Sequence, residues 1–212
     1  MIAGVLLAAG ASSRFGSNKL LAVLPDGRRV AEAACAALRP AVDRLIVVVR
    51  GGSSDLEACF KSFDAEVCPF PDADRGMGTS LAFGISRCAD ADGWLIALAD
   101  MPLVAAANAT RVVQALRKGA SIAVPVDGSR RGHPVGFSRR FIGELCALHG
   151  DVGARTILAA HPGDIDEIPV SDSGSWLDID TPADLVALHT LGIRPRLLSK
   201  AVKSGKLPAK TL

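Results

Sequence analysis

The sequence predicts an α/β fold, a three-layer α/β/α sandwich with a mostly parallel central sheet. Two observations lead to this prediction. Short apolar runs alternate along the chain with longer segments of helical pattern, and strands that alternate with helices form parallel sheets through right-handed crossovers. The strongest runs are apolar throughout and end close to glycine or proline, which is typical of strands buried on both faces.

The predicted elements follow one another from the N-terminus. Strong strand candidates are residues 2–8, 45–49 and 94–98, and weaker ones are 66–68, 121–124, 134–137 and 165–169. Helices are expected over 30–38, 78–88, 105–118, 140–148, 153–160 and 181–191. Thr181-Pro182 followed by Asp184, and Ser138 before two arginines, are helix-start signals, while Gly119 and Gly192 are expected helix ends. Ligands of such sheets bind beyond the carboxyl ends of the strands, so functional residues should follow the three strong strands.

The length of 212 residues suits one domain, which we expect over residues 1–191, followed by a basic tail over 192–212. The stretch from Arg194 to the last residue holds six lysines and arginines and no acid. Without it the chain has 18 basic and 22 acidic residues, which argues against a nucleic-acid-binding face on the domain. Aromatic residues are 4%, with no tyrosine, so a base-stacking platform is also disfavoured.

The cysteines and the apolar runs indicate the compartment. The five cysteines are spread singly with no Cys-x-x-Cys pair, which disfavours a zinc knuckle and a disulfide framework and fits a reducing environment. The apolar opening lacks a basic flank, and no apolar run reaches membrane-spanning length. We therefore expect a cytoplasmic protein with neither a membrane nor a nucleic acid as partner.

The loop after the first strand has the composition of a phosphate-binding loop. Gly10 and Gly16 let the backbone approach a ligand, and two cations, Arg14 and Lys19, lie in the same loop. The glycines are six residues apart and Lys19 comes three after the second, so neither a dinucleotide fingerprint nor a P-loop fits.

Six motifs, in this order, resemble those of the molybdenum cofactor cytidylyltransferase family, which implies a Rossmann-like fold of the nucleotide-diphospho-sugar transferase type. They are LAAGASSRFGSNK (7–19), GMGTSL (76–81), LADMP (98–102), GHPV (132–135), GDVGAR (150–155) and DIDTP (178–182). The resemblance covers the whole predicted domain. It implies an Mg²⁺-dependent enzyme that moves CMP from CTP to the phosphate of molybdenum-loaded molybdopterin and releases pyrophosphate.

Such a transfer needs positioning and charge neutralisation rather than a protein nucleophile. The expected catalytic residues are Arg14, Lys19 and Asp100, with the two cations on the triphosphate. The expected nucleotide-binding residues are Leu7, Ala8, Ala9, Gly10, Ala11, Ser12, Ser13, Arg14, Gly16, Lys19, Gly76, Gly78, Ser80 and Asp100. For Gly78, a simple helix-start glycine is the alternative.

Metal binding is expected from aspartates. Asp100 follows an apolar strand and precedes a proline, so its carboxylate is predicted to bind Mg²⁺, with an N-cap of the next helix as the structural alternative. Asp178 and Asp180 would point to opposite faces of an extended segment, so only one should reach the metal. The resemblance favours Asp178 as the second ligand, and Asp180 is then expected to cap the last helix.

Base choice is predicted from Ala9. Guanylyl-transferring relatives resemble Leu-Ala-Gly-Gly here, and the methyl of Ala9 would crowd a purine, which favours CTP. One methyl gives a discrimination of only about 1–3 kcal/mol, so other contacts must contribute.

The acceptor side is expected to include Gly132, His133 and Pro134, together with Asp151 and Arg155. His133 shows no metal-ligand spacing with the other histidines, and a hydrogen-bonded core histidine is its structural alternative. Gly150-Asp151 could equally be a turn that leads into a helix.

Other functions stay open at this point. The acceptor could be a sugar phosphate or an isoprenoid-precursor phosphate. A non-catalytic maturation partner of a molybdenum hydroxylase, with the basic tail as docking arm, is another alternative. For the enzyme itself, the hydroxylase or its maturation factor is the protein partner that the resemblance implies. An oxidoreductase is disfavoured because the dinucleotide fingerprint and its acidic ribose ligand are both missing.

Overall fold

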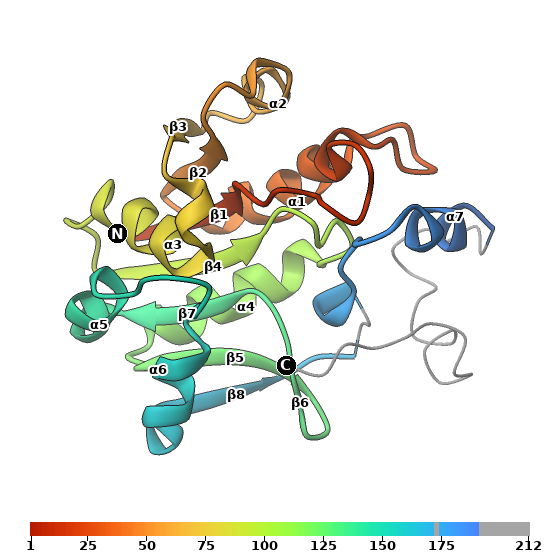
Figure 1. Cartoon of the computed structure of the whole chain (residues 1–212). Helices are drawn as coiled ribbons and strands as arrows, with labels where there is room; N and C mark the ends of the chain where they lie inside the picture. The colour runs from red at the N-terminus through yellow and green to blue at the C-terminus, as the bar shows by residue number, and fades with distance from the viewer. Residues whose placement is uncertain (172–173, 191–212) are drawn as a thin grey trace.

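The computed structural model describes residues 1–171 and 174–190, and these form a sheet with helices on both of its faces (Figure 1). The strands are β1 (Ile2–Ala8), β2 (Arg44–Arg50), β3 (Glu66–Phe70), β4 (Gly93–Leu98), β5 (Ile122–Asp127), β6 (Arg130–Arg131), β7 (Val135–Ser138) and β8 (Ile165–Pro169). The helices are α1 (Val30–Leu38), α2 (Ser54–Cys59), α3 (Met77–Ser86), α4 (Ala106–Arg117), α5 (Ile142–Cys146), α6 (Arg155–Ala160) and α7 (Pro182–Thr190).

The strand order across the described sheet is β3-β2-β1-β4-β7-β5-β6, and β8 pairs with β5. Neighbouring strands from β3 to β4 are parallel, as are β5 and β8, whereas β7 runs antiparallel to both β4 and β5. The predicted mostly parallel sheet is therefore confirmed. After β3 the chain returns to the other side of β1 to form β4, so the carboxyl ends of β1 and β4 flank a topological switch point, where ligands of such sheets bind.

Two apolar clusters, one on each face, form the core and confirm the three layers. Along β1, Ile2 and Leu6 belong to the cluster that includes α1 and α4 residues, whereas Ala3 and Val5 belong to the cluster that includes α3 and α5 residues. Because side chains of a strand alternate between faces, a strand covered on both sides is apolar at every position. This explains the continuous apolar runs.

Most predicted elements are present within one to three residues of their predicted bounds. The short α2 and the two-residue β6 were missed, because neither is long enough to show a periodic pattern. The helix predicted for 140–148 is a 3-10 turn, Arg139–Phe141, followed by the five-residue α5, and Ser138 makes no side-chain cap hydrogen bond. Gly119, with φ +102°, follows α4 as expected.

Two further expectations concern the C-terminal residues and membrane-spanning segments. Gly192 and the basic tail over 192–212 lie outside the described residues. Within 1–171 and 174–190, every helix is too short or too polar to cross a membrane.

Candidate active site

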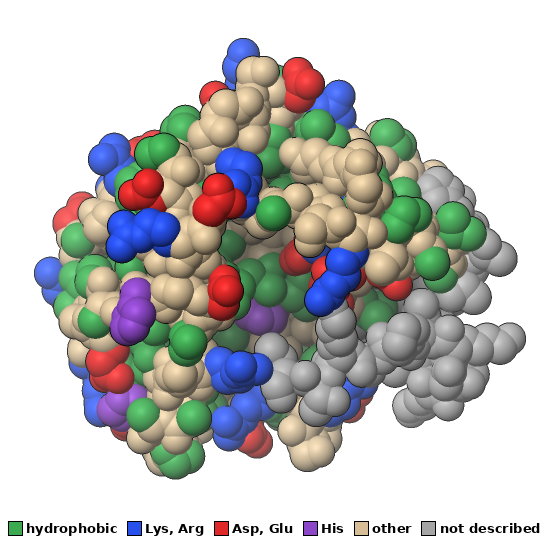
Figure 2. Space-filling view, in the orientation of Figure 1, with side chains coloured by type: hydrophobic (Ala, Val, Ile, Leu, Met, Phe, Trp, Pro, Cys, Tyr) green, Lys and Arg blue, Asp and Glu red, His purple; other side chains and the backbone are tan. Residues whose placement is uncertain are grey.

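A pocket of about 310 Å³ opens at the carboxyl ends of β1 to β4, and Figure 2 shows a hollow with hydrophobic side chains in its floor and charged side chains around its rim. Of the predicted nucleotide-binding residues, the pocket is lined by Leu7, Ala8, Ala9, Gly10, Ala11, Lys19, Gly76, Ser80 and Asp100. The lining lacks Ser12, Ser13, Arg14, Gly16 and Gly78. The loops that follow β1, β3 and β4 thus meet in one place, as the topology requires.

The loop after β1 is closed by its own polar groups. The Ser12 hydroxyl accepts a hydrogen bond from the backbone N–H of Lys19 at 3.3 Å, and the Ser12 carbonyl accepts one from the N–H of Phe15 at 3.0 Å. Gly16 has φ +78°, a left-handed conformation that glycine adopts without steric cost. Ser12 and Gly16 therefore shape the loop, while Ala9, Gly10 and Ala11 face the pocket.

Lys19 lies between two carboxylates. Its Nζ donates to Asp100 Oδ2 at 2.7 Å and to Asp180 Oδ1 at 2.9 Å, and the residue is 9% exposed. Burial by itself would lower the pKa of Lys19, but the charges and hydrogen bonds of Asp100 and Asp180 outweigh it and raise that pKa. The buried ammonium is thus kept protonated. Arg14 is exposed, and its Nη1 lies 3.4 Å from Asp180 Oδ2.

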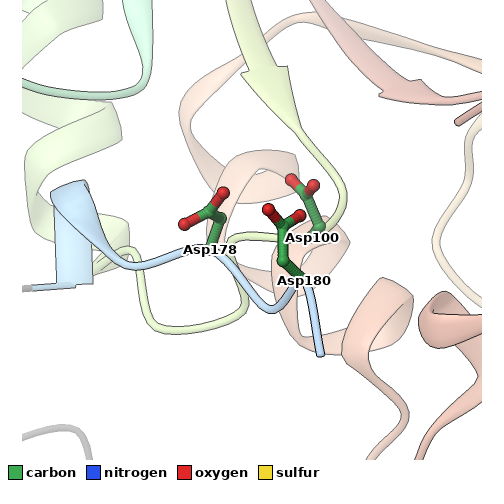
Figure 3. A group of neighbouring side chains, drawn as sticks. All are labelled: Asp100, Asp178 and Asp180. Carbon is green, nitrogen blue, oxygen red and sulfur yellow. The ribbon is translucent and has the colours of Figure 1, made fainter. Parts of the chain in front are cut away.

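Three aspartates converge beside this lysine. Asp100 extends from the end of β4, and Asp178 and Asp180 come from the segment after the turn Gly174–Trp176 (Figure 3). Each offers a carboxylate oxygen, and these atoms lie within 4.8 Å of one another. The expectation that Asp178 and Asp180 point to opposite faces of an extended segment is wrong, because residues 177–180 are not a regular strand and both carboxylates approach Asp100.

Two capping interpretations are also corrected. The N-terminus of α7 is capped by Thr181, whose Oγ1 accepts from the N–H of Asp184 at 3.3 Å, while Asp184 Oδ2 accepts from the N–H of Thr181 at 2.8 Å. Asp180 therefore uses its carboxylate for Lys19 rather than for the cap. Asp100 does not cap α4, which begins at Ala106 with Ala105 at its N-cap.

These residues fit a divalent metal ion. Carboxylate oxygens are hard ligands of the kind that Mg²⁺ and Mn²⁺ prefer. Asp100 Oδ1 is buried and has no hydrogen-bond partner among the described residues, a costly state for a carboxylate oxygen that a bound cation would relieve. Asp100, Asp178 and Asp180 are thus the candidate ligands, and the assignment of individual ligands stays a prediction.

Gly76 and Gly78 permit close contact between the start of α3 and the backbone of residues 150–152. A Cβ on Gly78 would lie 2.3 Å from the carbonyl oxygen of Val152, and the Gly78 N–H donates to the Gly150 carbonyl at 2.8 Å. Gly150 has φ +61°, so this segment is indeed a turn, and it brings Asp151 to the pocket wall. Gly78 packs helix α3 on that turn rather than facing the ligand space.

The remaining predicted acceptor residues lie apart from the pocket lining. The N–H of His133 donates to the Ser175 carbonyl at 2.9 Å, and the His133–Pro134 peptide bond is cis. His133 Nδ1 is buried without a hydrogen-bond partner among the described residues, so the alternative of a fully hydrogen-bonded core histidine does not hold for this atom. Burial lowers the pKa of His133, and the charge of Asp100 opposes this shift without cancelling it. Gly132 lies against Trp176, and Arg155 is exposed at the start of α6.

Two charged residues of the pocket were not predicted from the sequence. Arg50 ends β2 and Asp74 lies in the loop after β3, and Arg50 Nη1 is 2.6 Å from Asp74 Oδ1. The available signal was a cation at the carboxyl end of a buried strand, directly before Gly51-Gly52.

The chain is similar in sequence to proteins of one known family. The family described as "MobA-like NTP transferase domain" matches residues 4–165. The purine catabolism protein PucB of Bacillus subtilis is 32% identical over 193 residues, covering 85% of this chain and 92% of PucB. The nicotine blue oxidoreductase of Paenarthrobacter nicotinovorans is 28% identical over 195 residues, covering 88% of this chain and 96% of that protein.

The chain is also similar to solved structures. Rv0371c of Mycobacterium tuberculosis superposes with a TM-score of 0.79 at 32% identity, covering 89% of this chain and 97% of that one. The manganese complex of Rv0371c superposes with a TM-score of 0.75 at 30% identity, covering 89% and 98%.

Proposed function

The chain belongs to the MobA-like NTP transferase domain family, and from this premise we propose that it transfers CMP from CTP to the terminal phosphate of molybdenum-loaded molybdopterin. The observation that carries the proposal is a nucleotide-sized pocket lined by the buried Lys19 and by Asp100, with the carboxylates of Asp178 and Asp180 converging on Asp100. Nucleotidyl transfer requires each of these parts.

In the proposed step, an oxygen of the acceptor phosphate attacks the α-phosphorus of CTP. A new P–O bond forms to the acceptor, the bond from the α-phosphorus to the bridging oxygen breaks, and pyrophosphate leaves. Lys19 and the backbone of Gly10 and Ala11 would hold the triphosphate in line for this displacement. Arg14, which is exposed beside the site, is positioned to add a second cation.

Asp100, Asp178 and Asp180 are the proposed carboxylates for the metal. A manganese complex of a relative at 30% identity supports a divalent cation, and we propose Mg²⁺. When bound, Mg²⁺ neutralises charge on phosphate oxygens and makes pyrophosphate a better leaving group.

CTP is the proposed nucleotide because Ala9, in the pocket wall after β1, restricts the size of the base. Ala9 is 5% exposed and lines the pocket with Ala8, so its methyl group narrows the space that a base would enter. We expect this restriction to favour the binding of a pyrimidine nucleotide over a purine nucleotide by about 1–3 kcal/mol.

The acceptor is proposed from the resemblance of the GHPV and GDVGAR motifs. Asp151 lines the pocket, and Gly132, His133, Pro134 and Arg155 remain proposed acceptor residues. A sugar phosphate or an isoprenoid-precursor phosphate is the alternative acceptor. A molybdenum hydroxylase, or its maturation factor, is the proposed recipient of the product, with the tail over 192–212 as a proposed docking arm.

The test is pyrophosphate release by the full-length protein with Mg²⁺ and molybdenum-loaded molybdopterin, comparing CTP, GTP, ATP and UTP. We expect release that requires the pterin and CTP, and an Asp100→Asn variant that is slower by more than about 100-fold with its fold intact. Release with sugar phosphates but not with the pterin would overturn the proposed acceptor. Because one relative is named an oxidoreductase, oxidation of NADH and NADPH is followed in parallel, and turnover there without pyrophosphate release would overturn the transferase proposal.

A further inference from the structure

Arg50 and Asp74 give the pocket a second polar end. In the sheet, β1 lies between β2 and β4, and neighbouring strands are about 4.8 Å apart, so the ends of β2 and β4 are about 10 Å apart. Asp100 follows β4, whereas Arg50 ends β2 and Asp74 follows the adjacent β3. A nucleotide with its phosphates beside Asp100 and Lys19 would therefore extend past the β1 loop toward Arg50.

The ion pair leaves hydrogen-bonding capacity on both partners. Asp74 Oδ1 holds Arg50 Nη1 at 2.6 Å, and the Asp74 side chain is 82% exposed. Arg50 Nε is buried without a partner in the described part of the chain. An arginine fork has donors to spare once Nη1 is paired, and a carboxylate accepts more than one hydrogen bond. The surrounding wall is apolar, with Ala8, Ala9 and Ala73.

We infer that Arg50 and Asp74 select cytosine over uracil, an inference that rests on the proposed function. Asp74 would accept from the 4-amino group of cytosine, a contact that carboxylates make with this base. Arg50 would donate to the neighbouring acceptors N3 and O2. Uracil reverses two of these three positions, because it presents a carbonyl oxygen to Asp74 and an N3–H group to Arg50, while its O2 remains an acceptor. The Ala9 methyl group limits size and cannot make this distinction, so the charged pair supplies what Ala9 lacks.

A second arginine–aspartate ion pair, outside the pocket, serves as a control for the Arg50–Asp74 pair. Arg39 and Asp64 also form a 2.6 Å ion pair, with side chains 27% and 91% exposed, compared with 30% and 82% for Arg50 and Asp74. Arg39→Met thus reports the general effect of losing such a surface pair.

The experiment is calorimetric binding of non-hydrolysable CTP and UTP analogues to the full chain with Mg²⁺. We expect the wild type and Arg39→Met to prefer CTP by about 10–100-fold, as for hydrogen bonds to charged groups, and Arg50→Met to lose most of this preference. Asp74→Asn, whose amide can donate to the 4-carbonyl of uracil, should shift the preference toward UTP. Thermal unfolding confirms that each variant is folded.

The inference is overturned if Arg50→Met keeps the wild-type ratio of affinities, if it weakens both nucleotides equally, or if the wild type prefers UTP. A protein that binds CTP selectively through Arg50 but transfers nothing to the pterin would instead contradict the proposed function, so the two failures are distinguishable.

Discussion

Lys19→Met is expected to destabilise the protein when divalent metal is absent. The substitution keeps an unbranched apolar stem and removes the ammonium that donates to Asp100 and Asp180 at 2.7 and 2.9 Å. Removing one partner of a buried ion pair costs about 3–5 kcal/mol, and because these carboxylates are 22% exposed we expect about 2–3 kcal/mol here. At about 2–4 °C per kcal/mol for a domain of this size, the Tm in EDTA should fall by about 4–12 °C.

Divalent metal should reverse much of this loss. Asp100 and Asp180 lose the Lys19 ammonium in the variant, so Mg²⁺ or Mn²⁺ meets no competing ammonium at the three aspartates. A ligand at one hundred times its Kd stabilises a folded protein by about 2.7 kcal/mol. Differential scanning calorimetry in EDTA and in a series of metal concentrations measures both effects. Lys61→Met, which changes an exposed lysine, is the matched control.

Two results would refute this reasoning. Unfolding of Lys19→Met at the wild-type temperature in EDTA would mean that the ion pairs contribute no net stability. Equal stabilisation of both proteins by metal would mean that Lys19 and the cation do not share the carboxylates. The pH dependence gives an independent check: because the pKa of Lys19 is raised, its stabilisation is fully present below the unfolded value of 10.5 and is lost as the pH rises through the higher folded pKa.

Three further outcomes are expected. Gly78→Ala should lower the free energy of unfolding by about 1–3 kcal/mol, because its Cβ would lie 2.3 Å from the Val152 carbonyl, whereas Gly143→Ala, with open space around it, should be neutral or stabilising in the same urea titration. Because the pKa of His133 is lowered, the unfolded chain binds its proton first, so wild-type stability should fall as the pH drops below about 6.5. A His133→Asn variant should show a shallower fall, and an unchanged slope would contradict the burial argument. With a thiol reagent, Cys146 should react first in the native protein, because the other four cysteines are buried, and Cys146→Ser should abolish this fast reaction.

The sheet could be predicted because strands that are buried on both faces are continuous apolar runs in the sequence. β1, residues 45–49 of β2, and β4 are apolar, and a glycine or a charged residue comes within two residues of each run, so these strands and their mostly parallel arrangement could be predicted. The loop of residues 7–19 was identified on the same basis, since its glycines, hydroxyl groups and cations are neighbours in sequence. Local composition was sufficient for these features.

The rest of the site depends on contacts between distant segments. Arg50 and Asp74 are 24 residues apart and each resembles a solvated surface charge, until the parallel pairing of β2 with β3 brings the two strand ends together. Asp178 and Asp180 were assigned opposite directions from strand geometry, but the irregular segment after the turn at Gly174 sends both toward Asp100. Sequence periodicity applies to regular elements, and these side chains lie where regularity ends.

The charges of the site explain why one lysine and one metal would serve the same reaction. Lys19 and the more exposed Arg14 offer two positive charges beside three carboxylates, so this group of residues stays negative and would repel a triphosphate. A divalent cation on the carboxylates would remove that repulsion and leave the ammonium, which is 9% exposed, available to the phosphates. Asp100, which accepts a hydrogen bond from Lys19, would then also bind the metal. The low exposure of Lys19 excludes water and so strengthens its electrostatic interactions with the carboxylates and the phosphates. Nucleotide binding should therefore require the divalent cation before any transfer takes place.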